Sequence, residues 1–419
     1  MIVDTEIEIR MVEILNSKEV NEALDSFNVV LAQISDLPPN YFTEVAATFA
    51  DMISQGSVTL VVSRRIGRRL TEFVDSFSDD NLVIETLQEM LYRLQPRAIA
   101  FEYELAYLRD RLAQRLMKVG KVKEAVEMLR AIPVDSHARG YSDEYKLQIC
   151  ARLTECLTIL KDFECIENVL NQVSKMLPSC TDEDLKMKFK IAQALLLDSK
   201  QKFLEAGQRY IELSIRFRGV STETQRTEFL EHALISTILG GASQQRARLL
   251  TFLYRDDRCR ALKAYPVLEK MYNQRLISRE CIGSLRPLII QYYADLFGGE
   301  NGQKLDAVLE RVVVEHNMIA ASKVYCNITL KNLAELLEIE TDQAESIAAQ
   351  MIEEERLDAL IDQIDGLIFF ERDNVNTVTS SIRTQNLWTS LNQILENIEA
   401  DHPKWIAERT ENGRVRENC

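Results

Sequence analysis

Residues 357–370 read LDALIDQIDGLIFF, and this stretch decides the fold of the carboxyl-terminal part of the chain. Two apolar runs, Leu357–Ile364 and Leu367–Phe370, flank the dipeptide Asp365-Gly366. Asp-Gly between alternating apolar runs is the strongest short-range signal for a β-hairpin, because the turn needs residues that tolerate positive φ. The stretch therefore predicts a two-stranded wing.

Two short amphipathic helices are predicted just before this wing. The first has Thr329 as its N-cap and one apolar face made by Leu330, Leu333, Leu336 and Leu337. The second follows residues 338–341, with Asp342 as its expected cap and Glu345 three residues later. Its expected buried stripe consists of Ala344, Ile347, Ala348, Met351 and Ile352. Helix, helix and wing in this order predict a winged helix at residues 306–371.

The charge of the second helix argues against DNA binding, although many winged helices read DNA with this helix. Phosphate contacts require Lys or Arg. From 342 to 356 the single base is Arg356, and the acids are Asp342, Glu345, Glu353, Glu354 and Glu355. A protein-binding role is favoured instead, because the outer strand of a wing leaves N–H and C=O groups with which another chain's strand can pair.

Two basic clusters lie outside the winged helix, on predicted helices. They comprise Arg64, Arg65, Arg68 and Arg69, and then Arg246, Arg248, Arg255, Arg258 and Arg260. Their spacing places the charges on one helix face. Solvated or intramolecular pairing is the favoured use, a protein interface is the second and RNA binding the third.

An internal repeat with a period of 40 to 41 residues precedes the winged helix. The same apolar spacing recurs at Leu116, Val122, Ala125 and Leu129, at Leu157, Phe163, Ile166 and Leu170, and at Leu197, Phe203, Ala206 and Tyr210. Each unit has helical spacing on both sides of a short polar break, which predicts a pair of antiparallel helices. Stacked pairs predict a right-handed solenoid of the tetratricopeptide kind at 96–305. A compact bundle with a recurring helix length is the alternative.

Composition supports a mostly helical chain. Only 14 Gly and 8 Pro occur in 419 residues, too few to punctuate a β-rich fold. Residues 58–62 are β-rich by composition, yet amphipathic flanks continue past them and predict a helix there. We therefore expect an all-α fold, with a helical arm at 1–95 before the repeats.

A long helix is predicted after the wing, within residues 372–419. Trp388, Leu391, Leu395 and Ile398 follow three- and four-residue spacing, and few charges lie between Asn374 and Ala400. A solvated helix usually carries more charge, so this one is expected to join a bundle with other helices. Packing only on its own winged helix is the alternative.

Charge and the reactive residues restrict the function. The net charge of −15 disfavours nucleic acid and anionic membranes as main partners. Eight Cys without close pairs and four scattered His provide neither a disulfide framework nor a metal motif. Neither a Gly-rich phosphate loop nor a secretory signal is evident, so we expect a soluble, intracellular protein that is not an enzyme and uses no cofactor.

The order of these elements is similar to that of the PCI-domain proteins, which are scaffold subunits of the proteasome lid, the COP-nine signalosome and a translation initiation factor. Several short sequence segments closely resemble those of the subunit-four family of the signalosome. They are Ser243–Arg246, Arg258-Cys259, Leu268–Tyr272, Glu315–Asn317, Ala321–Lys323, Asn327–Thr329, Leu336–Ile339, Gln350-Met351 and Ile361–Gly366. The resemblance runs from about Ser57 to Trp405, whereas the first 40 residues match poorly.

The resemblance implies a non-catalytic scaffold in the cytoplasm and nucleus, in a complex that removes a ubiquitin-like modifier from cullins. Its implied partners are other PCI subunits, the MPN metalloprotease subunits and cullin–RING ubiquitin ligases, the last contacted by the N-terminal arm. The residues implied for assembly are Ile361, Ile364, Leu367 and Phe369 in the wing, and Trp388, Leu391, Leu395 and Ile398 in the terminal helix. A proteasome-lid scaffold and a nucleic-acid-binding winged helix are the alternatives.

Overall fold

The structure, a computed structural model, describes residues 10–14, 20–35, 39–54, 59–134, 141–216, 222–297, 302–370 and 387–394. The chain divides into two compact units, Met1–Phe229 and Leu230–Cys419. Both are dominated by helices, which confirms the predicted fold class. The predicted four-part division at residues 95, 305 and 371 stays a prediction.

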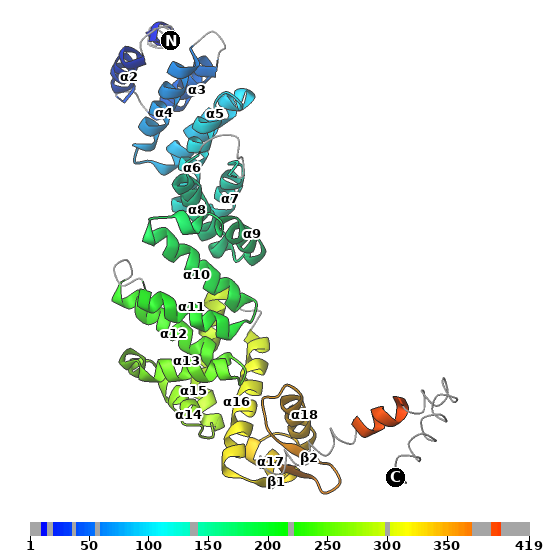
Figure 1. The fold of residues 1–419 in the computed structure, drawn as a ribbon. Coiled ribbons are helices and arrows are strands. Elements are labelled where there is room, and N and C mark those ends of the chain that lie inside the picture. Colours follow the sequence, from blue (N-terminus) through cyan, green and yellow to red (C-terminus); the bar gives the residue numbers. More distant parts are fainter. Residues whose placement is uncertain are drawn as a thin grey trace, which may run out of the picture. The chain divides into compact units, whose positions relative to one another are not determined.

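The first unit is a stack of helices in chain order (Figure 1). They are α2 (Val20–Ser35), α3 (Pro39–Ser54), α4 (Leu60–Asp75), α5 (Asp80–Leu94), α6 (Glu102–Val119), α7 (Val122–Arg130), α8 (Asp143–Leu160), α9 (Phe163–Val173), α10 (Glu183–Ser199) and α11 (Phe203–Arg216). Short 3₁₀ turns lie at η1 (Gln95–Arg97) and η2 (Leu177–Ser179). Residues 60–62 begin α4, so their β-rich composition is overridden by the helix around them, as predicted.

Three consecutive helix pairs, α6–α7, α8–α9 and α10–α11, correspond to the predicted repeats. Each pair turns at a residue with positive φ, namely Gly120 (85°), Lys161 (61°) and Gln201 (59°). The next residue's N–H then bonds the carbonyl five positions back, as from Lys121 to Leu116 at 2.9 Å. This left-handed cap satisfies helix carbonyls that would otherwise lack donors. The three units therefore share the backbone conformation of the turn as well as the spacing of their apolar residues.

We expect Lys161→Gly to stabilise the first unit. A side chain at φ 61° costs about 1–2 kcal/mol relative to right-handed backbone. The added freedom of Gly in the unfolded chain offsets about 0.5–1 kcal/mol, which leaves a gain of up to about 1.5 kcal/mol in the free energy of unfolding measured in urea. Gly120→Ala is the matched reverse change, because no atom lies within 4 Å of an added Cβ and only backbone strain is introduced. If the wild type, Lys161→Gly and Gly120→Ala unfolded with equal free energy, the positive φ at these turns would have no effect on stability, which would contradict the prediction.

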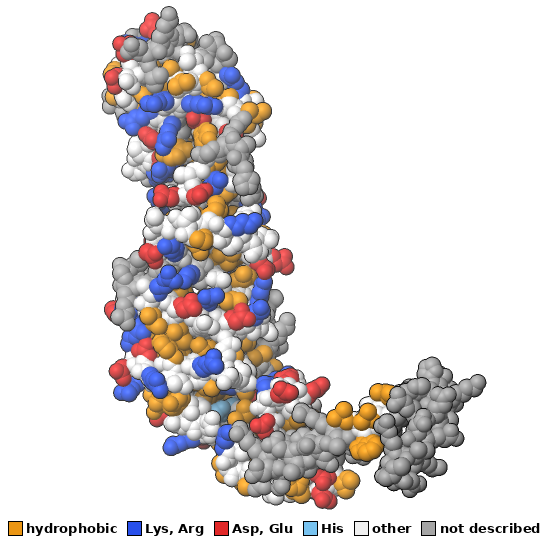
Figure 2. Space-filling model, in the orientation of Figure 1, with side chains coloured by type: hydrophobic (Ala, Val, Ile, Leu, Met, Phe, Trp, Pro, Cys, Tyr) orange, Lys and Arg blue, Asp and Glu red, His pale blue; other side chains and the backbone are white. Residues whose placement is uncertain are grey.

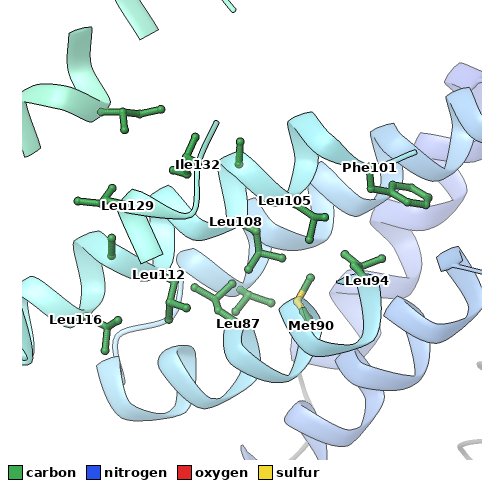
Figure 3. Close-up of a cluster of buried hydrophobic side chains, with 14 of the residues drawn as sticks. Leu87, Met90, Leu94, Phe101, Leu105, Leu108, Leu112, Leu116, Leu129 and Ile132 are labelled. Carbon is green, nitrogen blue, oxygen red and sulfur yellow. The ribbon is translucent and has the colours of Figure 1, made fainter. Parts of the chain in front are cut away.

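A continuous core of the first unit extends from Met11 to Ala192 and includes residues of α2 through α10. Figure 3 shows part of it, where Leu87 and Met90 of α5 meet Leu105, Leu108 and Leu112 of α6. Polar clamps supplement this core. Arg115 of α6 bonds Asp75 at 2.8 Å and Asp80 at 2.5 Å, and Arg152 of α8 bonds the buried Asp110 of α6. Neighbouring helices are thus joined by both apolar and charged contacts.

The first basic cluster is used largely within the unit, as favoured from sequence. Arg64 donates to the carbonyl of Ala100 at 2.6 Å, and Arg68 and Arg69 both pair with Glu72. Arg68 also lies over the ring of Tyr107, with 5.0 Å between Cζ and the ring centroid. These contacts leave less of the cluster's charge for an external anion.

The second unit begins at Leu230, within α12 (Glu223–Leu239). It continues with α13 (Gln244–Arg255), η3 (Asp257–Ala261), α14 (Tyr265–Tyr272), α15 (Arg279–Phe297) and α16 (Gly302–Val324). A three-stranded sheet and two short helices follow: β1 (Asn327–Thr329), α17 (Leu330–Leu337), α18 (Thr341–Glu353), β2 (Leu360–Asp362) and β3 (Leu367–Phe369). Residues 387–394 are also helical. None of the helices in the described ranges is both long and apolar enough to cross a bilayer.

Candidate assembly surface

The winged helix predicted from sequence is present at the end of the second unit. Its core is formed by α16, α17, α18 and the sheet, and Met318, Leu333, Ala344, Met351 and Ile368 are completely buried in it. Thr329 caps α17 as predicted, because its Oγ1 accepts from the N–H of Asn332 at 3.2 Å. Glu338, at φ 57°, ends α17 and turns the chain toward α18.

The predicted cap of the second helix is wrong. The helix begins at Thr341, one residue before Asp342, so Asp342 lies in the first turn. Glu340 is the N-cap, and its side chain makes no capping hydrogen bond. The acid of Asp342 still suits the positive end of the helix dipole, so the residue favours the same helix from a different position. The predicted stripe is confirmed, with Ile347 and Ile352 only partly buried.

The wing is part of a three-stranded sheet, rather than the two-stranded hairpin predicted. β3 pairs antiparallel with both β1 and β2, which gives the order β1-β3-β2. The β2–β3 turn forms as expected, since Asp362 Oδ1 accepts from the N–H of Ile364 at 3.0 Å and Gly366 has φ 62°. Consequently β3 is the central strand, and the outer strands are β1 and β2.

The strand alternation separates two faces of this sheet. Ile328, Ile361 and Ile368 form one row that packs on the winged-helix core. Leu367 and Phe369 are half-buried and, by the alternation of the strand, lie on the opposite face. Ile364, at the turn, is 96% exposed. Of the four predicted wing residues, Ile361 therefore supports the core, while the other three are accessible to a partner.

The helix at 387–394 presents an uncovered apolar surface. Its exposed fractions are 63% for Leu387, 61% for Trp388, 52% for Leu391 and 54% for Ile394. Figure 2 shows these hydrophobic side chains gathered on the short helix near the C-terminus. A run of large apolar side chains this exposed is typical of an interaction site. Leu395 and Ile398 lie outside the described residues, as does most of the predicted long helix.

Three consecutive polar residues of α16 join it to the elements on either side. Glu315, His316 and Asn317 are 3%, 6% and 6% exposed. His316 Nε2 lies 3.0 Å from the carbonyl oxygen of Arg275, and burial lowers the pKa of His316 to about 4. Asn317 accepts from the N–H of Ile277 at 2.8 Å and donates to its carbonyl at 3.0 Å. The segment after α14 is thereby held against α16.

Glu315 holds the winged helix on the same helix. Its Oε2 accepts from Arg356 Nη1 at 2.5 Å, and its Oε1 accepts from Arg311 Nε at 3.1 Å. Burial alone would raise the pKa of Glu315, but the hydrogen bonds from Arg356 and Arg311 outweigh it and lower the pKa. The single base near the end of α18 is therefore used inside the protein, which removes it from any contact with phosphate.

In the sequence, Glu315–Asn317 is only one of the segments that carry the family resemblance, and no role is predicted for these residues. Strand β1 is not predicted from sequence either, because Asn327–Thr329 is short and Thr329 is already expected to be a helix cap. The signal for β1 was the β-branched pair Ile328-Thr329, which is weak at this length. Among the described residues, no group of three or more His, Cys, Asp or Glu is placed to hold a metal ion.

The chain matches two family models. The model described as PSMD12/CSN4, N-terminal, covers residues 14–216, and the PCI domain model covers residues 302–372. The second match ends at the wing, which agrees with the winged helix in the structure.

Curated relatives match across most of the chain. COP9 signalosome complex subunit 4 of Drosophila melanogaster is 33% identical over 85% of this chain and 86% of the relative. The protein of the same name from Arabidopsis thaliana is 32% identical over 90% and 94%. The one from Emericella nidulans is 29% identical over 94% and 97%. Each of these matches covers more than four fifths of this chain and of the relative.

Proposed function

Since this chain belongs to the COP9 signalosome subunit 4 family of PCI-domain proteins, we propose that it is a non-catalytic scaffold that supports removal of a ubiquitin-like modifier from cullins. The observation that carries this role is the apolar face of helix 387–394, with Trp388 61% exposed. Such a face is unfavourable in water and suits a bundle formed with helices of other subunits.

The wing offers a second assembly surface. The outer edge of β2 can pair with a strand of a neighbouring PCI subunit, and the half-buried Leu367 and Phe369 add apolar contact beside it. The chemistry would come from the MPN metalloprotease subunits of the same complex. The N-terminal helices would contact the cullin–RING substrate, and the complex would work in the cytoplasm and nucleus.

Phe369→Asp should weaken retention of a neighbouring PCI subunit while leaving the winged helix folded. Phe369 is half-buried on the outer face of β3, whereas the adjacent Ile368 faces the core and is completely buried. Because interface aromatics commonly contribute 2 kcal/mol or more, we expect a loss of about 30-fold or more in affinity. Co-purification from cells, with circular dichroism of the purified variant, measures both properties.

Gln343→Asp is the matched control for that experiment, since it adds the same charge at an exposed position of α18. Ile364→Asp tests separately whether the tip of the β2–β3 turn contributes to binding the neighbouring subunit. Normal retention of every neighbour by Phe369→Asp would show that this face is not an interface.

Affinity purification separates the proposed function from a proteasome-lid role. Tagged chain should retain cullins, and it should not retain the proteasomal ATPases. Nucleic acid should not be retained at low salt, because a phosphate-dependent interaction would be strongest there. Enrichment of a proteasomal ATPase in place of cullin would refute the proposal.

A further inference from the structure

A cleft of about 690 Å³ in the second unit lies apart from the wing and the terminal helix. It is bordered by α13, α14, α16 and the residues that follow α18. Polar side chains supply much of its lining, among them Ser243, Gln244, Arg246, His316 and Arg356. None of these residues belongs to the proposed assembly surfaces.

Arg246 is the unusual member of this lining. It is only 3% exposed, and burial lowers its pKa to about 10. Its Nη2 has two weak acceptors, Met271 Sδ at 3.0 Å and the carbonyl of Ile238 at 3.5 Å. Its Nε is buried with no acceptor at all. A guanidinium has five N–H donors, and a buried charge without good acceptors is unfavourable.

The surroundings of Arg246 favour an anion. Helix α13 is 12 residues long and begins at Gln244, so its positive end borders the cleft. Ser243 Oγ caps this end by accepting from the backbone N–H of Arg246 at 3.2 Å. His316 stays neutral near pH 7, because burial lowers its pKa to about 4.

The nearby charges indicate how much negative charge the ligand carries. Arg356 pairs with Glu315 at 2.5 Å and with Glu354 at 2.6 Å, and Arg311 also pairs with Glu315. These two arginines and two glutamates balance, and the lining also holds the buried Arg246 and the exposed Glu355, whose charges are equal and opposite. The charge of Glu315 also acts on Arg246 and raises its pKa, against the larger effect of burial. Because the site carries no excess positive charge, a ligand with a single negative charge fits it better than a doubly charged phosphate.

We propose that this cleft binds a carboxylate group, which accepts hydrogen bonds from Arg246 at the N-terminus of α13. The carboxylate comes either from an acidic side chain of another subunit or from a free small acid. Planar carboxylate oxygens match the donor geometry of a guanidinium. Carboxylate binding by the isolated chain is independent of membership in the signalosome, whereas a source in another subunit rests on the proposed function.

Thermal unfolding of the full chain in sodium acetate and in sodium chloride, at equal pH and ionic strength, tests the site. Because a ligand that binds only the native state raises its stability, acetate should raise the wild-type midpoint by about 2 °C or more relative to chloride. Arg246→Met should abolish that difference. Arg248→Met is the matched control, because Arg248 is exposed on α13 and does not line the cleft. An equal response of wild type and Arg246→Met, or no response in wild type, would overturn the proposal.

A measurement on the wild-type chain covers the case in which Arg246→Met fails to fold. The buried Nε–H of Arg246 should give a slowly exchanging NMR signal, and that signal should shift saturably with acetate and remain unmoved by equal chloride. A signal indifferent to acetate would refute the site. Within the assembled complex, loss of the acetate response identifies a partner's acidic side chain as the occupant, whereas its persistence identifies a free acid.

Discussion

Trp388→Asp is expected to detach this chain from its complex while its helical content stays unchanged. Trp388 lies on a helix whose apolar side chains are more than half exposed, with 61% for Trp388 itself and 52% for Leu391. Buried tryptophans are frequent hot spots, with truncation costs of 2 kcal/mol or more, and an aspartate adds the cost of a desolvated charge. We therefore expect the affinity to fall by at least about 100-fold.

The measurement is co-purification through a tag, with circular dichroism as the test of folding. Ser390→Asp is the matched control, because it adds the same charge to an exposed polar position of the same helix turn. Its retention should be close to that of the wild type. If the Trp388→Asp chain still recruits its partners in normal amounts, the terminal helix is not an anchor.

Arg356→Ala should destabilise the second unit by about 3 kcal/mol at pH 7. The change removes the 2.5 Å hydrogen bond to Glu315, whose side chain is 4% exposed. Loss of one partner of a buried ion pair costs about 3–5 kcal/mol, because the remaining charge is left unpaired. The lower end applies here, since Arg311 still pairs with Glu315 at 3.1 Å. Urea unfolding followed by signals from each unit measures the loss.

Two further variants test whether the unpaired charge of Glu315 causes the loss of stability in Arg356→Ala. Arg279→Ala removes an ion pair with Glu338 in the same unit, but Arg279 is 74% exposed, so the loss should stay below about 1 kcal/mol. The double variant Glu315→Gln with Arg356→Met should recover much of the stability, because neither charge remains buried alone. If Arg356→Ala lowered the free energy of unfolding by no more than Arg279→Ala does, the buried ion pair between Arg356 and Glu315 would not be the cause of stability proposed here.

The stabilisation by the Glu315–Arg356 ion pair should decrease as the pH falls. The pKa of Glu315 is lowered from 4.5 in the folded chain, so the stabilisation is fully present above the ordinary pKa. It is lost as the pH falls through the folded pKa, when Glu315 takes up a proton. The stability gap between wild type and Arg356→Ala should therefore narrow in acid and stay constant from pH 6 to 8.

The helical repeat could be predicted because its signal is local and recurs. Apolar spacing located the pairs, and the structure adds the left-handed turn at Gly120, Lys161 and Gln201. Only the first of these is glycine, so residue type alone could not indicate the other two. The position of each turn followed from the period, whereas its conformation follows from the helix packing on both sides.

The winged helix shows the limit of the same reasoning. The Asp365-Gly366 turn and the Thr329 cap were predictable because short-range chemistry determines them. The strand β1 was not, because its pairing with β3 joins residues about 40 positions apart and the sequence of three residues is too short to indicate it. Pairing on both sides of β3 changes which strand a partner can reach.

The candidate surfaces were predictable only as apolar patterns. The same spacing describes a core residue and an interface residue, and Ile361 and Ile364 illustrate the difference. Ile361 packs toward the winged-helix core, while Ile364 is 96% exposed. The buried Arg246 was grouped with surface arginines, because its helical spacing does not reveal that α14 and α16 cover it.

Mass spectrometry of endogenous complexes purified through a tag on this chain tests the central claim most directly, namely that the chain contributes binding surfaces to a larger assembly. We predict that the other PCI subunits and the MPN metalloprotease subunits of the signalosome appear in equal amounts with it, and that cullins appear in smaller amounts. Recovery of the chain alone, or cleavage of a modified cullin by the purified chain without other subunits, would contradict the account.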